Sequence, residues 1–581
     1  MSATFSPRDH MARSSLFTVA FAPVVLLTLA PLGDAAAQRG NRPPMIRLPA
    51  RTEIPEGMPW SGRISAPDPE GSPVTISVSG LPPGARWLPH EGRVTFTPDF
   101  IQGGYTWPVT VTASDGQAVS EGRFNLTVFD TLKPPEPRVL SEERVGSCTV
   151  LKMHQITDVF LDEERKAGRG IPAAVAIPNR RGPHPVKITL HGFGGGPRAR
   201  CDGRSIVIAP YDPQNSYWWG HGQHALGGVG APDYTARRVL HLLEWVLKNV
   251  DGADPQRVYV SGHSMGGAGA ATIGLLHSRH FAWIHAREGQ SVPRNHRPSR
   301  LMQLKALWGP IVPDARKRHG IWDHMDLTRI VTEQPDARDQ FISLEHGKDD
   351  PVIHFGAAVQ PSPLTGLNLY QALQKHHVGH FASWDEGGHG PPDPILGHRW
   401  WTEGWHPIFD EVTFLRRDLA FPAFSGFSLD GNPGGFVGNG TLLWHEETGY
   451  AGDHTTAGDT GWEGDIAGAL NRFLRWDATT IVDTPDRFEI AFKLVDGRGG
   501  PAPRSGYPTT GDRLPEPKSG TVSVTPRRVQ AFLCTPGEKV RWRLQGDSKA
   551  SGHVTAGDDG SITVPDLPVN TQWQRLVLSR R

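Results

Sequence analysis

The most constraining stretch of this chain of 581 residues runs from Arg257 to Leu276 and has a serine at its centre. It opens with Arg-Val-Tyr-Val, a short β-branched run that predicts a buried strand. Gly-His-Ser-Met-Gly follows at 262–266, and small and aliphatic residues that favour a helix come next. The glycines allow a sharp turn that lifts the Ser264 hydroxyl above the sheet edge, where the first amides of the helix face its target. We therefore interpret Ser264 as a nucleophile.

The chain around this motif, from about residue 139 to 421, predicts an α/β domain. Its strands are predicted by apolar runs at 186–190, 205–210, 281–284, 341–344 and 381–384. Apolar residues at helical spacing after Asp233 predict a helix that leads to the serine motif. Strands that alternate with helices are typical of a mostly parallel sheet.

A serine hydroxyl is a weak nucleophile at neutral pH, so Ser264 needs a base, and the base needs an orienting carboxylate. Asp349 and Asp350 lie in a turn after the 341–344 strand, and both are candidates for that carboxylate. Among 26 histidines, His389 is distinguished by the glycines that bracket it in the loop after the 381–384 strand. This backbone freedom lets its imidazole swing over Ser264, so we expect His389 to be the base.

These features resemble the α/β-hydrolase family over about residues 140–420, because the Gly-x-Ser-x-Gly turn is followed by an acid and then a histidine. The resemblance implies a doubly wound, mostly parallel sheet and a triad of Ser264, Asp350 and His389. The family's acid stands three residues after a turn glycine and just before a β-branched pair, which selects Asp350 over Asp349. Such a triad requires no cofactor and no metal.

His-Gly-Phe-Gly at 191–194 resembles the family's oxyanion loop, since it follows an early buried strand. The resemblance implies that the amide of Met265 and the amide of Phe193 or Gly194 stabilise the oxyanion of a tetrahedral intermediate. Each such donor contributes about 3 kcal/mol. The alternative for this loop is a plain glycine-rich turn.

Three further side chains lie where the family often builds its substrate cleft. Trp218 and Trp219 follow the second strand, and Glu288 follows the 281–284 strand. We expect these residues to contact substrate. The alternatives are packing beneath a lid for the tryptophans and a solvated charge for Glu288.

Residues 38–130 alternate polar and apolar positions between turn sequences such as Leu-Pro-Pro-Gly and Asp-Gly, which predicts a small β-sandwich. Ala-Pro-Asp-Pro-Glu-Gly at 66–71 and Ala-Ser-Asp-Gly at 113–116 resemble cadherin-like or immunoglobulin-like modules. Such modules can bind calcium through carboxylates, or the carboxylates can be merely solvated or capping. The candidates here are Glu56, Asp68, Glu70 and Asp115.

A proline-rich linker is predicted at 131–138, and a second β-sandwich at 422–581. The evidence for that second sandwich is a set of strand-like runs at 521–524, 529–533 and 561–564. Together with the assignments above, this predicts an α/β catalytic domain at 139–421 between two β-rich modules. We expect these modules to contact a polysaccharide or another surface.

The N-terminus predicts export. Arg8 and Arg13 precede an apolar run, and three alanines at 35–37 offer a cleavage site, so residues 1–37 are interpreted as a signal peptide. A membrane anchor is the alternative, but the run is short and interrupted by prolines. We expect the mature protein to be secreted or periplasmic and to lack a membrane span. In an oxidising compartment Cys148 and Cys201 are the expected disulfide pair.

Charge narrows the class of partner. Lysine plus arginine equals aspartate plus glutamate at 60 each, so no global field attracts nucleic acid.

The stretch at 254–267 resembles both exported carboxylesterases and prolyl-oligopeptidase-type peptidases. Peptidases of that type carry an N-terminal β-propeller, which a stretch as short as 38–130 cannot form. We therefore predict a secreted serine hydrolase that cleaves the carboxylic ester of a small or polymeric substrate. A peptidase is the first alternative, and a non-catalytic binding or adhesion protein is the second.

Overall fold

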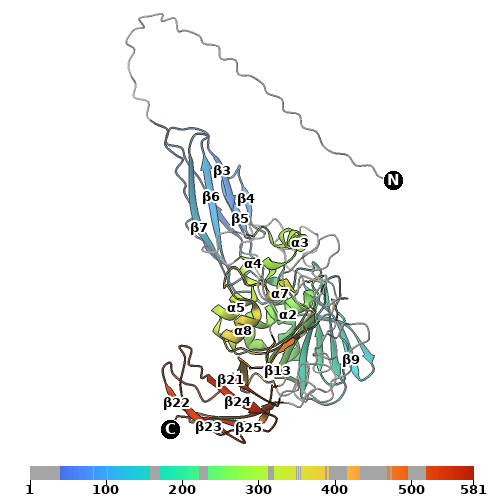
Figure 1. Ribbon diagram of the computed structural model, residues 1–581. Coiled ribbons are helices and arrows are strands. Elements are labelled where there is room, and N and C mark those ends of the chain that lie inside the picture. Colours follow the sequence, from blue (N-terminus) through green and yellow to red (C-terminus); the bar gives the residue numbers. More distant parts are fainter. Residues whose placement is uncertain are drawn as a thin grey trace, which may run out of the picture.

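A computed structural model describes residues 40–82, 84–100, 102–156, 170–220, 233–311, 320–347, 350, 352–353, 355–385, 389–390, 415–431, 468–471, 474–494 and 518–580. The predicted signal peptide at 1–37 and the competing acid Asp349 lie outside these ranges. No helix among the described residues is long and apolar enough to cross a membrane. The N-terminal strands and the C-terminal strands lie at opposite ends of the molecule, with an α/β part between them (Figure 1).

The α/β part contains a ten-stranded sheet in the order β18-β16-β15-β14-β13-β11-β12-β10-β9-β8. The strands from β11 to β16 pair in parallel, and the outer strands pair antiparallel. The bounds are β8 Arg138–Val145, β9 Cys148–Ile156, β10 Gly170–Pro178, β11 His184–Leu190, β12 Ile206–Ala209, β13 Ala253–His263, β14 Trp283–Arg287, β15 Phe341–Gly347, β16 Gly379–Asp385 and β18 Gly468–Leu470. The five sheet strands predicted from sequence are all present in it.

Helices cover one face of this sheet, because alternate strand residues such as Val258, Val260 and Ile284 share a core with the helices. The helix after Asp233 is α1, and its predicted apolar residues are buried. The helical segments are α1 Tyr234–Asn249, α2 Met265–Leu276, η2 Ser278–His280, η3 Pro293–Asn295, α3 Pro298–Trp308, α4 Ile321–His324, α5 Leu327–Glu333, α6 Pro335–Arg338, α7 Gly356–Val359 and α8 Leu369–Lys375. A disulfide joins Cys148 to Cys201, as predicted.

The opposite face of the sheet is covered by C-terminal strands. Tyr259, Trp283, Phe341 and Phe381 point to this face and share one core with C-terminal residues that include Trp476. The C-terminal strands form a three-stranded sheet (β17-β21-β24) and a five-stranded sheet (β19-β20-β25-β22-β23). Their bounds are β17 Phe421–Ser425, β19 Leu474–Thr484, β20 Arg487–Leu494, β21 Ser519–Arg527, β22 Lys539–Gln545, β23 Ala550–Thr555, β24 Val564–Asn570 and β25 Gln574–Ser579.

The two C-terminal sheets share one core with each other and with the central sheet. Two expected strands differ from the structure. The run at 561–564 lies almost wholly before β24, which begins at Val564, and the run at 529–533 is not a strand. Asp483 explains the difference at 529–533, because its carboxylate accepts hydrogen bonds from the amides of Gln530, Ala531 and Phe532. Those amides are therefore engaged by a side chain instead of a neighbouring strand.

The N-terminal strands form two sheets around a separate core. One sheet has the order β1-β7-β6-β3 and the other β2-β5-β4. Trp107 and Val109 from the first sheet meet Trp60 and Phe96 from the second in this core. The bounds are β1 Glu53–Pro55, β2 Trp60–Arg63, β3 Thr75–Ser79, β4 Arg86–Leu88, β5 Arg93–Phe96, β6 Thr106–Ser114 and β7 Val119–Phe129.

The four candidate calcium ligands do not come together. Glu56 accepts hydrogen bonds from the amides of Gly103, Thr131 and Leu132. Asp68 and Asp115 accept from amides of their own turns, and Glu70 pairs with an arginine. Among the described residues these carboxylates form no group compact enough for a metal ion. They cap turns and close loops, which was the alternative role.

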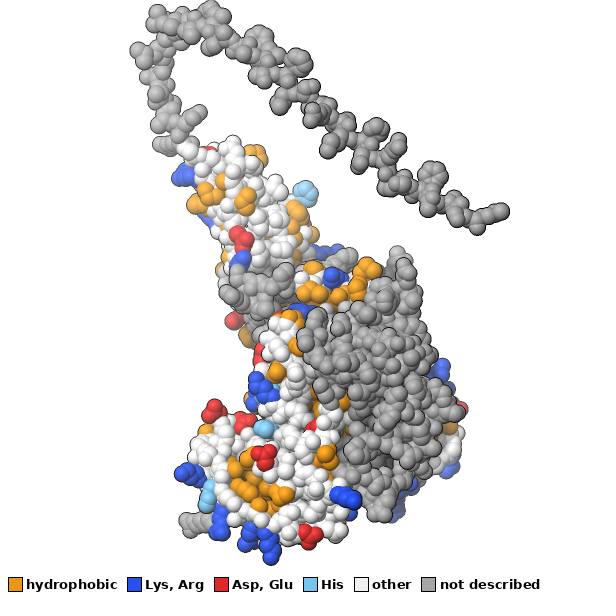
Figure 2. Space-filling view, viewed as in Figure 1, with side chains coloured by type: hydrophobic (Ala, Val, Ile, Leu, Met, Phe, Trp, Pro, Cys, Tyr) orange, Lys and Arg blue, Asp and Glu red, His pale blue; other side chains and the backbone are white. Residues whose placement is uncertain are grey.

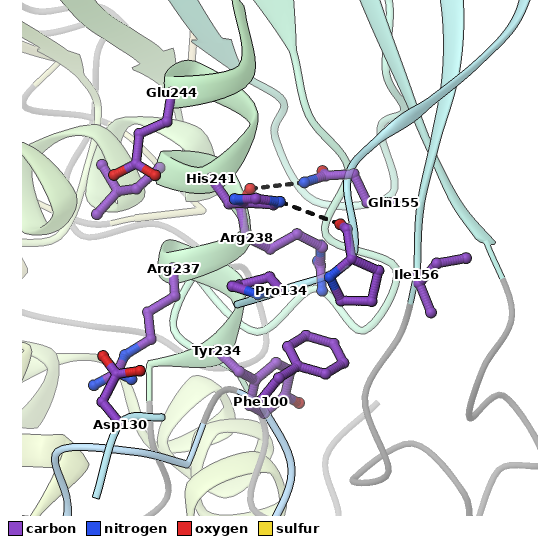
Figure 3. Close-up of a pocket in the computed structure, with 12 residues that line it drawn as sticks. Phe100, Asp130, Pro134, Gln155, Ile156, Tyr234, Arg237, Arg238, His241 and Glu244 are labelled. Carbon is purple, nitrogen blue, oxygen red and sulfur yellow. Dashed lines mark hydrogen bonds between the residues drawn. The ribbon is translucent and has the colours of Figure 1, made fainter. Parts of the chain in front are cut away.

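Polar side chains join the N-terminal module to α1. The Tyr105 hydroxyl donates to the Asp233 carboxylate, and the Arg237 guanidinium lies 4.3 Å from the centre of the Tyr105 ring. Asp233 stands at the helix N-cap but makes no capping bond through its side chain, which instead bonds Tyr105, Arg237 and His277. Beside this junction, the linker and α1 enclose a crevice of about 280 Å³ (Figure 3).

Candidate active site

Ser264 occupies the strained turn between β13 and α2. Its φ is +60°, a region that side-chain-bearing residues rarely adopt. The flanking glycines make the turn possible: a Cβ at Gly262 would lie 2.1 Å from the carbonyl oxygen of Gly266, and a Cβ at Gly266 would lie 2.2 Å from that of Leu190. The Ser264 amide donates to the Arg287 carbonyl at 2.9 Å, which ties the turn to β14.

The structure brings the three predicted triad residues together. His389 Nε2 lies 2.8 Å from the Ser264 hydroxyl, and His389 Nδ1 lies 2.7 Å from Asp350 Oδ2. Asp350 is fully buried, and its other oxygen accepts hydrogen bonds from the amides of Val352 and Ile353 at 2.7 and 2.9 Å. The β-branched pair that selected Asp350 therefore also fixes the carboxylate. A buried carboxylate on Nδ1 sets the tautomer that leaves Nε2 free to accept the serine proton.

The loop at 191–194, predicted to hold the oxyanion, lies against the serine. A Cβ at Gly192 would lie 3.6 Å from the Ser264 Cβ, an ordinary van der Waals distance, so this loop lies directly beside the serine. Met265 begins α2, and an amide in the first turn of a helix has no acceptor within the helix. The Gly194 amide donates to the Asn215 side chain at 2.7 Å. The Gly194 amide is therefore already engaged. Of the two amides predicted as the second donor to the oxyanion, that of Phe193 remains.

Trp218 and Trp219 do not form an open cleft wall. Both are almost fully buried within the helix-side core, in a segment where Trp218 has a φ of +68°. Trp218 donates its indole N–H to the His191 carbonyl at 3.3 Å and packs on the His191 ring, and Trp219 stacks on His324. Trp218 therefore packs on the 191–194 loop and Trp219 on α4, so both side chains have a packing role, which was the alternative. The sequence places aromatic residues after a strand, but it does not say which way they point.

Glu288 lies in the site, but in a different role from the one expected. It is fully buried directly after β14, and its carboxylate contacts His263 and the loop of His389. His263 Nε2 lies 2.5 Å from Glu288 Oε2, and the Gly390 amide donates to Oε1 at 3.0 Å. No local pattern near Glu288 announced these contacts, because neighbouring strands bring the residues together.

Burial sets the charge of the histidines around the triad. Burial, with a smaller contribution from the neighbouring His389 and Arg287, lowers the pKa of His263 to about 4. Burial also lowers the pKa of His346, which bonds the Ile353 carbonyl at 2.7 Å behind Asp350. His263 is therefore neutral at neutral pH and can donate its Nε2 hydrogen to Glu288.

His263, Glu288 and His389 place donor atoms within 4.8 Å of one another, a spacing that a metal ion could also use. Hydrogen bonds among these groups and to Ser264 and Asp350 account for their positions. The arrangement is that of a nucleophile, a base and an acid, which suits acyl transfer.

The comparisons agree with this chemistry. Residues 200–393, which include Ser264, Asp350 and His389, match the family model described as Esterase. Together with the sheet and the serine turn, this match identifies an α/β-hydrolase fold and supports ester hydrolysis. This chain is a hydrolase. No curated protein matches its sequence.

Similar solved structures include an S-formylglutathione hydrolase from Agrobacterium tumefaciens, with 16% identity, a TM-score of 0.31, and coverage of 43% of this chain and 92% of that one. The fluorophosphonate-binding serine hydrolase FphF from Staphylococcus aureus has 15% identity and a TM-score of 0.30, with coverage of 46% and 99%. A ferulic acid esterase has 18% identity and a TM-score of 0.31, with coverage of 46% and 98%. These values are too low to carry an argument about substrate.

Proposed function

We propose that this protein is a secreted serine esterase that acts through an acyl-enzyme on Ser264. The observation that carries the proposal is the continuous line of hydrogen bonds from the Ser264 hydroxyl through His389 to Asp350, at 2.8 and 2.7 Å. His389 accepts the serine proton as the oxygen attacks the ester carbonyl, and then gives it to the leaving alcohol. Water, activated by the same imidazole, releases the acid and restores Ser264.

The oxyanion of each tetrahedral intermediate is assigned to the amides of Met265 and Phe193. Both amides belong to backbone that is fixed before substrate arrives, one by the first turn of α2 and one by the loop packed on Trp218. Fixed donors of this kind need no reorganisation during the reaction, and each contributes about 3 kcal/mol.

Export and a polymeric or surface-bound ester substrate complete the proposal. The signal-like N-terminus supports export, and so does the Cys148–Cys201 disulfide, since such bonds persist in oxidising compartments. Among the described residues on the face shown in Figure 2, acidic and basic side chains are interspersed, as expected for a partner that is not strongly charged. The N-terminal module is then a spacer or adhesion module of cadherin-like or immunoglobulin-like type that holds the hydrolase part near such a surface.

The test is hydrolysis of p-nitrophenyl acyl esters and of aminoacyl and prolyl p-nitroanilides by the wild type and by Ser264→Ala. We expect ester turnover that falls at least about 10⁴-fold in Ser264→Ala, with no turnover of the anilides. Serine-dependent cleavage of the anilides would replace the esterase by a peptidase. Ester turnover that survives the substitution would show that Ser264 is not the nucleophile. A folded wild type that neither cleaves esters nor reacts with a fluorophosphonate would favour a binding protein.

A further inference from the structure

A second buried carboxylate, Glu288, stands beside the triad and has no part in the mechanism above. It has a φ of +48°, which is unusual for a side-chain-bearing residue. Its amide donates to the Glu345 carbonyl at 2.7 Å, and the carbonyl of the preceding Arg287 accepts from the Ser264 amide at 2.9 Å. The backbone that carries Glu288 is thus fixed both to the nucleophile turn and to β15, the strand that leads to Asp350.

The Glu288 side chain reaches the loop of the base from the side opposite the serine. One oxygen accepts a hydrogen bond from the Gly390 amide, next to His389, at 3.0 Å. The other oxygen lies 3.5 Å from His389 Nδ1, while Asp350 Oδ2 lies 2.7 Å from the same nitrogen. His389 Nδ1 therefore faces two buried carboxylates, one hydrogen-bonded and one at ion-pair distance.

The nearest neighbour of Glu288 brings no positive charge that would cancel a negative charge on this carboxylate. His263 contacts Glu288, but it is neutral at neutral pH because burial lowers its pKa to about 4. A neutral imidazole donates a hydrogen bond without cancelling the negative charge. When His389 takes up the serine proton, a carboxylate 3.5 Å away in a buried site stabilises the cation. Among the described residues, Asp350 and His346 also act on or contact His389, and Arg287 acts on the neighbouring His263.

We propose that Glu288 is a second acidic positioning residue for His389. It holds the histidine loop through Gly390, adds negative charge at Nδ1, and partly replaces Asp350 when that carboxylate is removed. This inference rests on the proposed roles of Ser264 and His389. It differs from a structural role because it predicts a change in the titration of His389.

The first experiment follows the ring signals of His389 by NMR against pH, in the wild type and in Glu288→Gln. Glutamine keeps an acceptor for the Gly390 amide but removes the charge, so the pKa of His389 should fall by about one unit. Glu345→Gln is the matched control, because it removes a buried carboxylate that pairs with His285 on the next strand. It should leave the titration of His389 unchanged. An unchanged His389 pKa in a folded Glu288→Gln variant would overturn the proposal.

The second experiment is a double-mutant cycle on ester hydrolysis with Glu288→Gln, Asp350→Ala and the combined variant. We expect about a 10-fold loss of kcat with unchanged KM in Glu288→Gln, and a shift of the acid limb of its pH profile to lower pH. Asp350→Ala should lose about 10²-fold and the double variant about 10⁴-fold, the usual effect of losing a triad acid. A double variant no slower than Asp350→Ala would contradict the substitution of one carboxylate for the other.

The two experiments separate this inference from the proposed function. The NMR titration needs no turnover, so a shifted His389 pKa in a protein without esterase activity would uphold the role of Glu288 and reject the esterase. Ester turnover that depends on Ser264, with no effect of Glu288→Gln on the His389 titration or on kcat, would uphold the esterase and reject the role of Glu288. Thermal unfolding of each variant confirms that the folded protein is being compared.

Discussion

The N-terminal strands meet the hydrolase part through polar side chains, whereas the C-terminal strands meet it through aromatic ones. On the N-terminal side, Tyr105, Asp233 and Arg237 join two regions that have separate cores. On the C-terminal side, Trp283 and Phe341 of the central sheet lie in one core with Trp476. Opening the N-terminal junction would expose little apolar surface beyond the contact of Phe100 with Tyr234, whereas opening a shared core would expose many aromatic side chains. The N-terminal module is therefore an addition to the hydrolase, and the C-terminal strands are a part of it.

Arginines reinforce the C-terminal attachment. Arg528 is buried and donates to the carbonyl oxygens of Asp339, Arg416 and Ala282, while its guanidinium lies 4.9 Å from the centre of the Phe421 ring. Arg527 donates to the carbonyls of His376 and His377 at the end of α8, where the helix dipole favours a cation. Carbonyls that strands and helices leave unpaired at this edge are thus satisfied by the C-terminal region.

The largest expected effect comes from removing each region in turn. A chain that ends at residue 414 exposes Tyr259, Trp283, Phe341 and Phe381. Their burial is worth up to about 20 kcal/mol at roughly 200 Å² per ring, which exceeds the net stability of a typical domain. We expect an insoluble, inactive product. A chain that begins at residue 138 loses the polar junction and the packing of Phe100 on Tyr234, and should keep at least half of the wild-type kcat/KM on a small ester. An equal loss of soluble protein in the two truncated chains would contradict the proposed difference between the N-terminal and C-terminal attachments.

A smaller effect should separate two matched tryptophans. Trp476 and Trp60 are 6% and 8% exposed, in the C-terminal and N-terminal cores respectively. Each change to alanine should cost its own core about 3–5 kcal/mol. Only Trp476→Ala should also lower the temperature at which esterase activity is lost, because only that core includes the central sheet. The measurement compares thermal inactivation with thermal unfolding in both variants, and inactivation at a lower temperature in Trp60→Ala would contradict it.

The smallest expected effect is a loss of folding stability as the pH falls. His380 is buried in β16 and bonded to Asn471, which also bonds the Phe424 carbonyl, and burial lowers the pKa of His380 to about 4. The unfolded chain, with a histidine pKa near 6.5, binds more protons between pH 6.5 and 4, so stability falls as pH falls through this window. The loss is at most about 3 kcal/mol. In urea unfolding between pH 7 and 4, His380→Gln should reduce the change of the unfolding free energy with pH. An unchanged pH dependence would show that groups other than His380 cause it.

The N-terminal junction should resist the same acid. Burial by itself would raise the pKa of Asp233, but the hydrogen bond and charge of His277 and the charge of Arg237 outweigh it and hold the pKa below its usual range. Asp233 therefore stays ionised and bonded to Tyr105 while His380 begins to take up a proton. The two attachments differ in chemistry as well as in strength.

The parts of the site that sequence predicted are those with local signals. Ser264 is marked by a turn that only glycines permit, and Asp350 by the β-branched pair whose amides hold it. Glu288 has no such signal, since its partners His263, His389 and Glu345 belong to three other segments of the chain. Its positive φ is a property of the folded backbone and leaves no mark on a glutamate in the sequence.

The fold shows the same limit. The unbroken apolar strands at 258–260 and 281–284 predict that both faces of the sheet are buried, and this is correct. They do not say what covers each face, so the C-terminal strands were interpreted as a separate sandwich. At 529–533 the alternation predicted a strand, but the carboxylate of Asp483, some 50 residues earlier, binds the amides that a ladder would need.

The shared core also has a consequence for the order of synthesis. The serine turn at 262–266 is made roughly 300 residues before β25, a delay on the order of tens of seconds at usual rates of translation. Until those last strands exist, the aromatic residues on one face of the central sheet lack the C-terminal residues that share their core in the described part of the chain. The N-terminal module, with its own core, can fold early, but the hydrolase part has to wait. Activity therefore reports that the whole chain has been made.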